Sequence, residues 1–330
     1  MKRNYYITKN GRLKRQDNTV YLEFESGEKK VIPIEDVEGF YLLGEIDLNT
    51  KLLNFLAQQK IPVHVFNYYG YYSGSYYPRE HLNSGFLLVN QVESYKNNKK
   101  RLSIAKEFIL SATHNILRNL KYYQSRQAGL EGYITDIEAK IPELEKARDI
   151  QELIAWEGHV RERYYDSFNV ILNLKEEFTK RTKRPPDNMM NALISFGNSL
   201  LYATTLGEIY HTQLNPTVSF LHEPGNRRFS LSLDISEVFK PIIVDHVIFK
   251  LINTGMLDDT DFDKDINFCY LTEKGRKTFL REYDERLDTT IKHRTLKRNV
   301  SYRHMIRLEC YNLEKCIAGI DEYKGFRSWW

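Results

Sequence analysis

The sequence predicts an α+β protein, in which a small N-terminal β-rich domain is followed by a larger, mostly α-helical domain. Three observations predict it. Short segments rich in Tyr, Val and Ile fill the first 80 residues, long segments with helical apolar spacing follow Pro78, and 42% of the 330 residues are hydrophobic, enough for a large core. We expect a β-rich domain over residues 1–80, a linker over 81–96 and a helical domain over 97–330.

The N-terminal segments alternate apolar and polar residues in runs typical of strands. We expect strands at residues 4–8, 19–25, 29–34, 37–43 and 61–66, with a helix at 49–59 before the last of them. Glycines such as Gly11, Gly27 and Gly44 separate the segments. Residues 66–77 contain six tyrosines, which favours aromatic pairs within a hairpin over stacking platforms for nucleic-acid bases.

The remainder of the chain has the periodicity of amphipathic helices. One helix is expected over residues 97–123, further helices begin near residues 134, 150, 188 and 235, and a last helix covers 302–319. No run of about 18 apolar residues is present, so we expect a soluble, cytoplasmic protein without membrane contact. Three cysteines without Cys-x-x-Cys spacing indicate neither a disulfide framework nor a zinc site.

Positive charge is concentrated in clusters, although the formal net charge is only +4. Between Asp288 and Glu309 there is no carboxylate but a series of basic residues, and shorter clusters occupy residues 99–101 and 180–184. Such clusters are commonly solvated faces, yet together they favour contact with phosphate. The residues expected to contact nucleic acid are Arg161, Arg184, Lys292, Arg294, Lys297, Arg298 and Arg303.

Glu157 is the first candidate for chemistry. Asp149 precedes Glu152 by three residues at the start of an apolar periodic run, a capping pattern that places Glu157 about two turns inside a helix. Arg161, four residues later, can pair with it, and a surface salt bridge alone would explain the spacing. Gly158 is a costly residue in a helix interior and suggests a close backbone approach.

A second group of candidates lies between residues 220 and 240. His222 precedes a Pro-Gly turn, where a loop can present a side chain to a site, although a lone histidine is seldom a metal ligand. Asp234 and Glu237 open a predicted helix and could simply be its cap. An Asp and a Glu three residues apart share one face, however, and only a short turn separates them from His222.

Carboxylates with an imidazole, and without thiolates, suit Mg²⁺ or Mn²⁺. Such a metal can polarise a phosphoryl oxygen and activate a hydroxyl nucleophile, and Lys240 could neutralise charge on the phosphate.

At these segments the sequence resembles the CRISPR-associated integrase family, CRISPR-associated protein one. The resemblance rests on several motifs in order. They are Trp156-Glu157-Gly158-His159, Arg184-Pro185-Pro186-Asp187 with Asn191-Ala192-Leu193, Leu221-His222-Glu223-Pro224, Leu233-Asp234-Ile235-Ser236-Glu237-Val238-Phe239-Lys240-Pro241, and the basic stretch at Tyr302-Arg303-His304. Together with the β-rich start they cover nearly the whole chain.

The resemblance implies that Glu157, His222 and one or both of Asp234 and Glu237 bind Mg²⁺ or Mn²⁺, with Lys240 beside the site. Many members have Asp at the position of Glu237, so which of the two acids is the direct ligand stays open. It also implies a homodimer formed through the β domain, a helical catalytic domain, and assembly with a small ferredoxin-like partner, CRISPR-associated protein two.

In this family the 3′-OH of a captured double-stranded DNA fragment attacks a phosphodiester at the repeat boundary of a CRISPR array. Two alternatives stay open: a general metal-dependent nuclease acting on branched DNA or RNA, and a non-catalytic DNA-binding scaffold whose carboxylates only cap helices and pair with arginines. A recombinase with a tyrosine nucleophile is disfavoured, because no tyrosine is singled out by spacing near the site.

Overall fold

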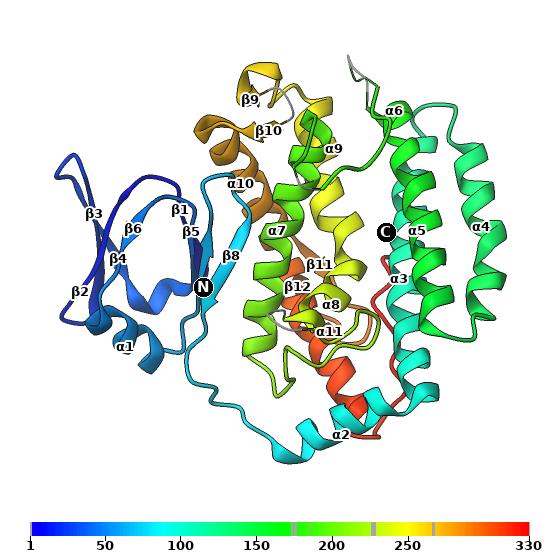
Figure 1. Ribbon diagram of the computed structural model, residues 1–330, viewed down its shortest axis with the longest axis horizontal. Helices are drawn as coiled ribbons and strands as arrows, with labels where there is room; N and C mark the ends of the chain where they lie inside the picture. The colour runs from blue at the N-terminus through cyan, green and yellow to red at the C-terminus, as the bar shows by residue number, and fades with distance from the viewer. Residues whose placement is uncertain are drawn as a thin grey trace.

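The computed structural model describes residues 2–172, 174, 177–183, 185–225, 229–265 and 268–329. A strand-rich region comes first and a helical region follows, with the two packed side by side (Figure 1), so the predicted α+β class is confirmed. Within the described residues, no helix is both long enough and apolar enough to cross a bilayer.

Two four-stranded sheets form the N-terminal part. The first has the order β1 (Arg3–Ile7), β5 (Val37–Leu42), β7 (Val63–Phe66) and β8 (Tyr72–Tyr76), with β8 antiparallel to the others. The second has the order β4 (Lys29–Pro33), β3 (Thr19–Phe24), β2 (Gly11–Gln16) and β6 (Ile46–Asp47). A short 3₁₀ helix η1 (Ile34–Asp36) and helix α1 (Thr50–Gln58) complete it, and Asn49 caps α1. The five predicted strands are confirmed; β2, β6 and β8 were not predicted.

Strand β5 belongs to two hydrophobic cores at once. Phe40 and Leu42 pack into the core between the two sheets, whereas Tyr41 and the following Leu43 pack into the core of the helical region. Successive side chains of a strand point to opposite faces, and a sheet covered on both faces has strands that are continuously apolar. The unbroken apolar run at residues 40–43 therefore joins the two parts of the chain.

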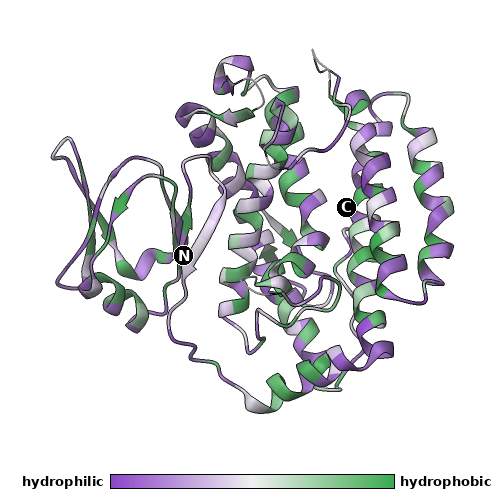
Figure 2. Cartoon of the chain, in the orientation of Figure 1, coloured by the Kyte–Doolittle hydropathy of each residue, from purple (hydrophilic) through white to green (hydrophobic). Residues whose placement is uncertain are grey.

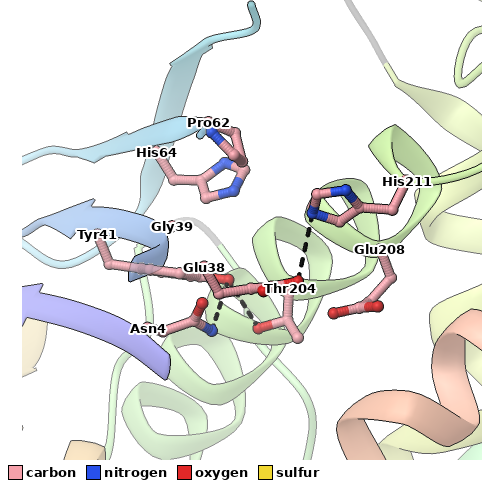
Figure 3. A pocket seen from close by; sticks show the side chains of 10 residues that line it. Asn4, Glu38, Gly39, Tyr41, Pro62, His64, Thr204, Glu208 and His211 are labelled. Atoms are coloured by element: carbon pink, nitrogen blue, oxygen red, sulfur yellow. Dashed lines mark hydrogen bonds and ion pairs between the residues drawn. The ribbon is translucent and has the colours of Figure 1, made fainter. Parts of the chain in front are cut away.

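Polar side chains reinforce this junction (Figure 3). The Tyr41 hydroxyl accepts a hydrogen bond from Asn4 Nδ2 at 3.3 Å and donates to Thr204 Oγ1 at 3.2 Å. Beside them, Glu38 pairs with His211. Arg307 forms a second ion pair with Glu38. The cavity that these residues line has a volume of about 10 Å³, room for roughly one water molecule, so it is too small for a substrate.

The helical region is built around α8 (Ser230–Lys240), which contacts α3 and α7 and lies between them in Figure 1. Hydrophobic residues predominate in α7, while hydrophilic residues are frequent on the outer helix α4 (Figure 2). The elements in order are α2 (Gly85–Lys96), α3 (Asn98–Gln124), α4 (Glu131–Glu145), α5 (Ile150–Asp166), α6 (Phe168–Ile171), α7 (Met189–Tyr210), α8, a π-helical turn η2 (Pro241–Asp245), α9 (His246–Asn253), η3 (Asp259–Asp261), β9 (Phe262–Asp265), β10 (Phe268–Leu271), α10 (Glu273–Asp288), β11 (Thr290–Lys292), β12 (Asn299–Ser301) and α11 (Tyr302–Ile317).

Two predicted boundaries need correction. Residues 81–96, predicted to be a linker, contain α2; Ser84 caps this helix, and buried Gln91 donates hydrogen bonds to the carbonyls of Asn215 and Val218. The helix expected to open at Asp234 begins a turn earlier, at Ser230. Asp234 and Glu237 are therefore not its cap.

The tyrosine-dense segment packs against aromatic residues, in agreement with the favoured interpretation. Tyr69 lies edge-on to Phe268 and Tyr270 of the β9–β10 hairpin, with ring centroids 4.6 and 5.5 Å apart, and Phe66 meets Tyr72 across β7 and β8. Aromatic residues of this segment therefore pair within the β7–β8 hairpin and also with the β9–β10 hairpin, which is distant in the sequence.

Substitution by alanine should have opposite effects on stability at two helical glycines, because one is closely packed and the other is not. A Cβ on Gly197 of α7 would lie 2.5 Å from Val244 Cγ1, so Gly197→Ala should lower the free energy of unfolding by about 1–3 kcal/mol through overpacking. No atom lies within 4 Å of a Cβ on Gly158, which corrects the expected close backbone approach there. Gly158→Ala should raise that free energy by about 0.8 kcal/mol. Urea denaturation measures both; equal effects of the two substitutions would contradict the packing described.

Candidate active site on helices α5 and α8

The structure brings together most of the residues that the sequence singles out. Glu157 and Arg161 lie on α5, Glu237 and Lys240 lie on α8, and His222 lies on the loop before α8, against Asp234. Arg184 lies outside the described residues.

Helix α5 begins where the capping pattern predicts. The Asp149 side chain accepts the backbone N–H of Glu152 at 2.8 Å, and Glu157 follows two turns inside the helix. Arg161 Nε donates to Glu157 Oε1 at 2.5 Å, which confirms the predicted i,i+4 pair. This pair is not a surface salt bridge, however, because the Arg161 side chain is only 13% exposed and also pairs with Glu237.

Helix α8 carries three ionisable side chains into the protein interior. Asp234, Glu237 and Lys240 are spaced three residues apart and so follow one face of the helix, and each is less than 7% exposed. Buried charges are costly unless they are paired or hydrogen-bonded. The face that these residues form therefore requires partners from other elements.

Glu237 is held between two cations. Its Oε2 pairs with the Arg161 guanidinium and its Oε1 with the Lys240 ammonium, which also lies 5.0 Å from the centre of the Tyr202 ring. Burial alone would raise the pKa of Glu237, but the charges of Arg161 and Lys240 outweigh it and lower that pKa below its ordinary value. Glu237 is therefore ionised at neutral pH and can act as an anionic ligand.

Asp234 has a different role, because its carboxylate is fully engaged. Its two oxygens accept the backbone N–H groups of Phe220, Leu221 and His222 at 2.6–3.0 Å, and Oδ1 also lies 2.8 Å from His222 Nδ1. Burial tends to lower the pKa of His222, but the bond to Asp234 and its charge, with that of Glu237, raise it above the ordinary value. Asp234 thus fixes both the loop and the imidazole. In the neutral form of the ring, this contact selects the tautomer with the proton on Nδ1 and the lone pair on Nε2.

Residues that sequence reasoning missed hold the His222 loop from the other side. Arg101 donates from Nε to the Phe220 carbonyl at 2.9 Å and from a terminal nitrogen to Glu223 at 2.6 Å. Tyr95 donates to the same carboxylate, and Ser219 Oγ donates to the His222 carbonyl. Arg101 was noticed only as part of a basic cluster, and no local spacing links it to a loop 120 residues away.

Two asparagines of α3 secure the end of α8, where Pro241 removes a backbone donor and the chain forms a π-helical turn. Asn115 donates to the Val238 carbonyl at 2.9 Å, and Asn119 donates to the Pro241 carbonyl at 2.7 Å. Asn119 also donates to the hydroxyl of Tyr164 on α5, so it ties the two helices of the site together.

Glu157, Glu237 and His222 provide the donor chemistry of a Mg²⁺ or Mn²⁺ site. Within the described ranges, no three His, Cys, Asp or Glu side chains lie close enough together to enclose a metal ion. The two carboxylates nevertheless converge on one guanidinium, that of Arg161, so a cation already lies between them. Two carboxylates and an imidazole oriented by a third carboxylate fit such an ion.

The basic residues of the C-terminal region separate into two groups. Lys292, Arg294, Lys297 and Arg298 are exposed on the β11–β12 hairpin, where a phosphate backbone could reach them. The buried position of Arg303 disagrees with the prediction that this residue contacts nucleic acid. It is 7% exposed and pairs with Asp284 and Asp288 at 3.0 and 3.1 Å, so its charge is used inside the protein.

Loss of the Asp234 charge should lower the pKa of His222. Asp234→Asn removes the anion that stabilises the imidazolium, and the amide replaces only part of the four hydrogen bonds, so we expect the free energy of unfolding to fall by about 3 kcal/mol. The pKa of His222 is raised in the folded state, so the Asp234 charge stabilises the wild-type protein fully below the unfolded-state pKa of about 6.5. The charge-dependent part of the stability that Asp234→Asn removes is therefore largest there, and it disappears as pH rises through the folded-state pKa.

NMR titration of the His222 ring measures the pKa, and urea denaturation at several pH values measures the stability. Glu223→Gln is the matched control, since this carboxylate is in the same loop but 63% exposed and bonded to Arg101 and Tyr95. An unchanged His222 pKa in Asp234→Asn would contradict the assigned role.

Comparison with known proteins gives consistent results. The family model of CRISPR associated protein Cas1 matches residues 5–285. The CRISPR-associated endonuclease Cas1 of Clostridium perfringens is 52% identical over 333 residues, covering 100% of both chains. The structure of a Cas1 protein from Thermotoga maritima superposes with a TM-score of 0.87 at 41% identity, covering 98% of this chain and 99% of that one.

Two more distant structures share the fold. A casposase bound to integration product has a TM-score of 0.86 at 20% identity, covering 98% of this chain and 92% of that one. A Cas6-RT-Cas1–Cas2 complex has a TM-score of 0.85 at 18% identity, covering 100% of this chain and 36% of that one. Because the family model matches most of the chain and a relative is 52% identical over all of it, the chain belongs to the CRISPR-associated Cas1 family.

Proposed function

We propose that this protein is a metal-dependent DNA integrase that inserts captured DNA fragments into a CRISPR array. The observation that carries the proposal is the convergence of Glu157 and Glu237 on a single cation, beside a histidine that a buried aspartate orients. The nuclease names of the curated relatives and the fold shared with a casposase support phosphodiester chemistry at this position.

Glu157, Glu237 and Nε2 of His222 are the groups that would hold Mg²⁺ or Mn²⁺. A bound ion would supply Lewis acidity toward a phosphodiester and toward the attacking 3′-OH. Asp234 accepts a hydrogen bond from Nδ1 and so orients the imidazole with Nε2 directed away from this carboxylate. Lys240 places a buried positive charge next to Glu237, where it can offset the negative charge of the reacting phosphate.

The partners follow from the same proposal. The exposed cations of the β11–β12 hairpin would contact the backbone of double-stranded DNA, a sequence-independent and salt-dependent interaction. We propose a homodimer formed through the β-rich N-terminal part. We also propose assembly with a small ferredoxin-like subunit, CRISPR-associated protein two, because a distant structure with this fold is a complex that includes Cas1 and Cas2.

Strand transfer tests the function directly. Purified protein, with and without its partner subunit, is given a labelled duplex with free 3′-OH ends and a repeat-bearing plasmid in Mg²⁺ or Mn²⁺. We expect joined product, and its rate of formation should fall by about 100-fold or more in Glu157→Gln and His222→Ala. EDTA or 3′-deoxy ends should abolish it.

Glu162→Gln is the matched control, because this residue is an exposed glutamate on the same helix and should leave joining unchanged. Cleavage without joining, with the partner present, would identify a general nuclease instead. DNA binding without either reaction would leave only a scaffold.

A further inference from the structure

A buried acid, Asp245, lies close to the candidate site. Asp245 ends the π-helical turn η2 and is 2% exposed, and its Oδ2 receives no hydrogen bond. Among the residues that the structure describes, none forms an ion pair with it. Burial raises the pKa of this carboxyl to about 7, although the charge of Arg161 and a hydrogen bond with Tyr164 both act to lower that pKa. A buried, half-satisfied carboxyl is costly and calls for an explanation.

The position of Asp245 relates it to Arg161. On α5, Arg161 is one turn after Glu157 and one turn before Tyr164, the residue that contacts Asp245. On the facing segment, Glu237 and Asp245 are separated by α8's last residues and the π-helical turn. The Arg161 guanidinium therefore pairs with two acids, Glu157 and Glu237, and Asp245 is a further acid whose charge acts on it.

Metal binding would create a conflict at this position. Glu157 and Glu237 are the carboxylates that a divalent ion needs, but Arg161 occupies both of them, and a guanidinium cannot lose its charge. Glu157, Glu237, Arg161 and Lys240 sum to zero charge, and Asp234 adds one negative charge beside a neutral His222. An added divalent ion therefore leaves an excess of one positive charge in a largely buried site. Since the Arg161 side chain is only 13% exposed, it cannot simply turn into water.

We propose that Arg161 exchanges partners when the metal binds, leaving Glu157 and Glu237 and pairing with Asp245. This inference rests on the proposed function, because it assumes that the two glutamates bind Mg²⁺ or Mn²⁺. Asp245 is then a positioning residue: it touches neither metal nor substrate, but its ionised form lowers the free energy of the loaded state by receiving the displaced guanidinium. In the metal-free state Arg161 pairs with both glutamates, and Lys240 pairs with Glu237 as well, so the two negative charges are neutralised.

Metal affinity, measured without any substrate, tests the proposal. Titration of the full-length protein with Mn²⁺, followed by electron paramagnetic resonance of the free ion, gives the dissociation constant. Asp245→Asn keeps the shape of the side chain but removes its charge, and we expect the dissociation constant to rise about tenfold. Arg161→Gln removes the competing cation, so we expect tighter binding than in the wild type.

The double variant supplies the decisive comparison. If Asp245 acts through Arg161, Asp245→Asn should have no further effect in the Arg161→Gln background, since the two substitutions belong to one interaction. The control is Glu309→Gln, which alters another buried carboxyl with a pKa raised to about 7, on α11 and hydrogen-bonded to Tyr323. It should leave Mn²⁺ affinity unchanged.

Three results would overturn the inference: unchanged affinity in Asp245→Asn, the same tenfold loss in the Arg161→Gln background, or weaker binding in Arg161→Gln alone. The last result does not depend on the folding of any Asp245 variant. Failure of the proposed function looks different, because the wild type itself would then bind no Mn²⁺ or would bind it equally well after Glu157→Gln.

Discussion

Helix α8 carries Asp234, Glu237 and Lys240 into the interior of the helical region, and the rest of the site is arranged to pair them. Asp234 receives backbone N–H groups from the His222 loop, and Glu237 receives Arg161 from α5. Each pairing fixes the position of another element, because an unpaired charge at this depth would cost several kcal/mol. The need to pair the buried charges of α8 therefore determines both how neighbouring elements pack around this helix and how the candidate active site is arranged.

The histidine loop shows how this constraint reaches function. Asp234 holds the loop from α8, and three further residues hold it from other elements: Tyr95 from α2, Arg101 from α3 and Ser219 from the loop itself. The metal ligand that we propose in this loop would need such support, because metal geometry tolerates little displacement. Gln91 of α2 donates to the Asn215 carbonyl in the segment before α8, and Asn115 of α3 donates to the Val238 carbonyl near the end of α8. Polar residues of α2 and α3 therefore hold the segments that carry the site without being part of it.

The sequence was sufficient to predict the α+β class, the start of α5, and the face shared by Asp234 and Glu237, because these depend on local periodicity and capping. It could not separate the roles of the two acids, since only the three-dimensional structure shows that Asp234 has no free oxygen. Arg303 was predicted to contact nucleic acid because it lies in a basic run, but long-range pairing with Asp284 and Asp288 buries it. Asp245 carries no sequence signal at all, because its significance comes from the proximity of the π-helical turn η2 to Tyr164 and Arg161 of α5.

The position of a bound Mn²⁺ ion tests the account most directly, and anomalous diffraction from crystals soaked in Mn²⁺ would locate it. We predict a single strong peak within ligand distance of Glu157, Glu237 and Nε2 of His222, with Arg161 turned toward Asp245 and Asp234 still bonded to Nδ1. A peak coordinated by Asp234, or Mn²⁺ bound elsewhere while Arg161 stays between the two glutamates, would contradict it.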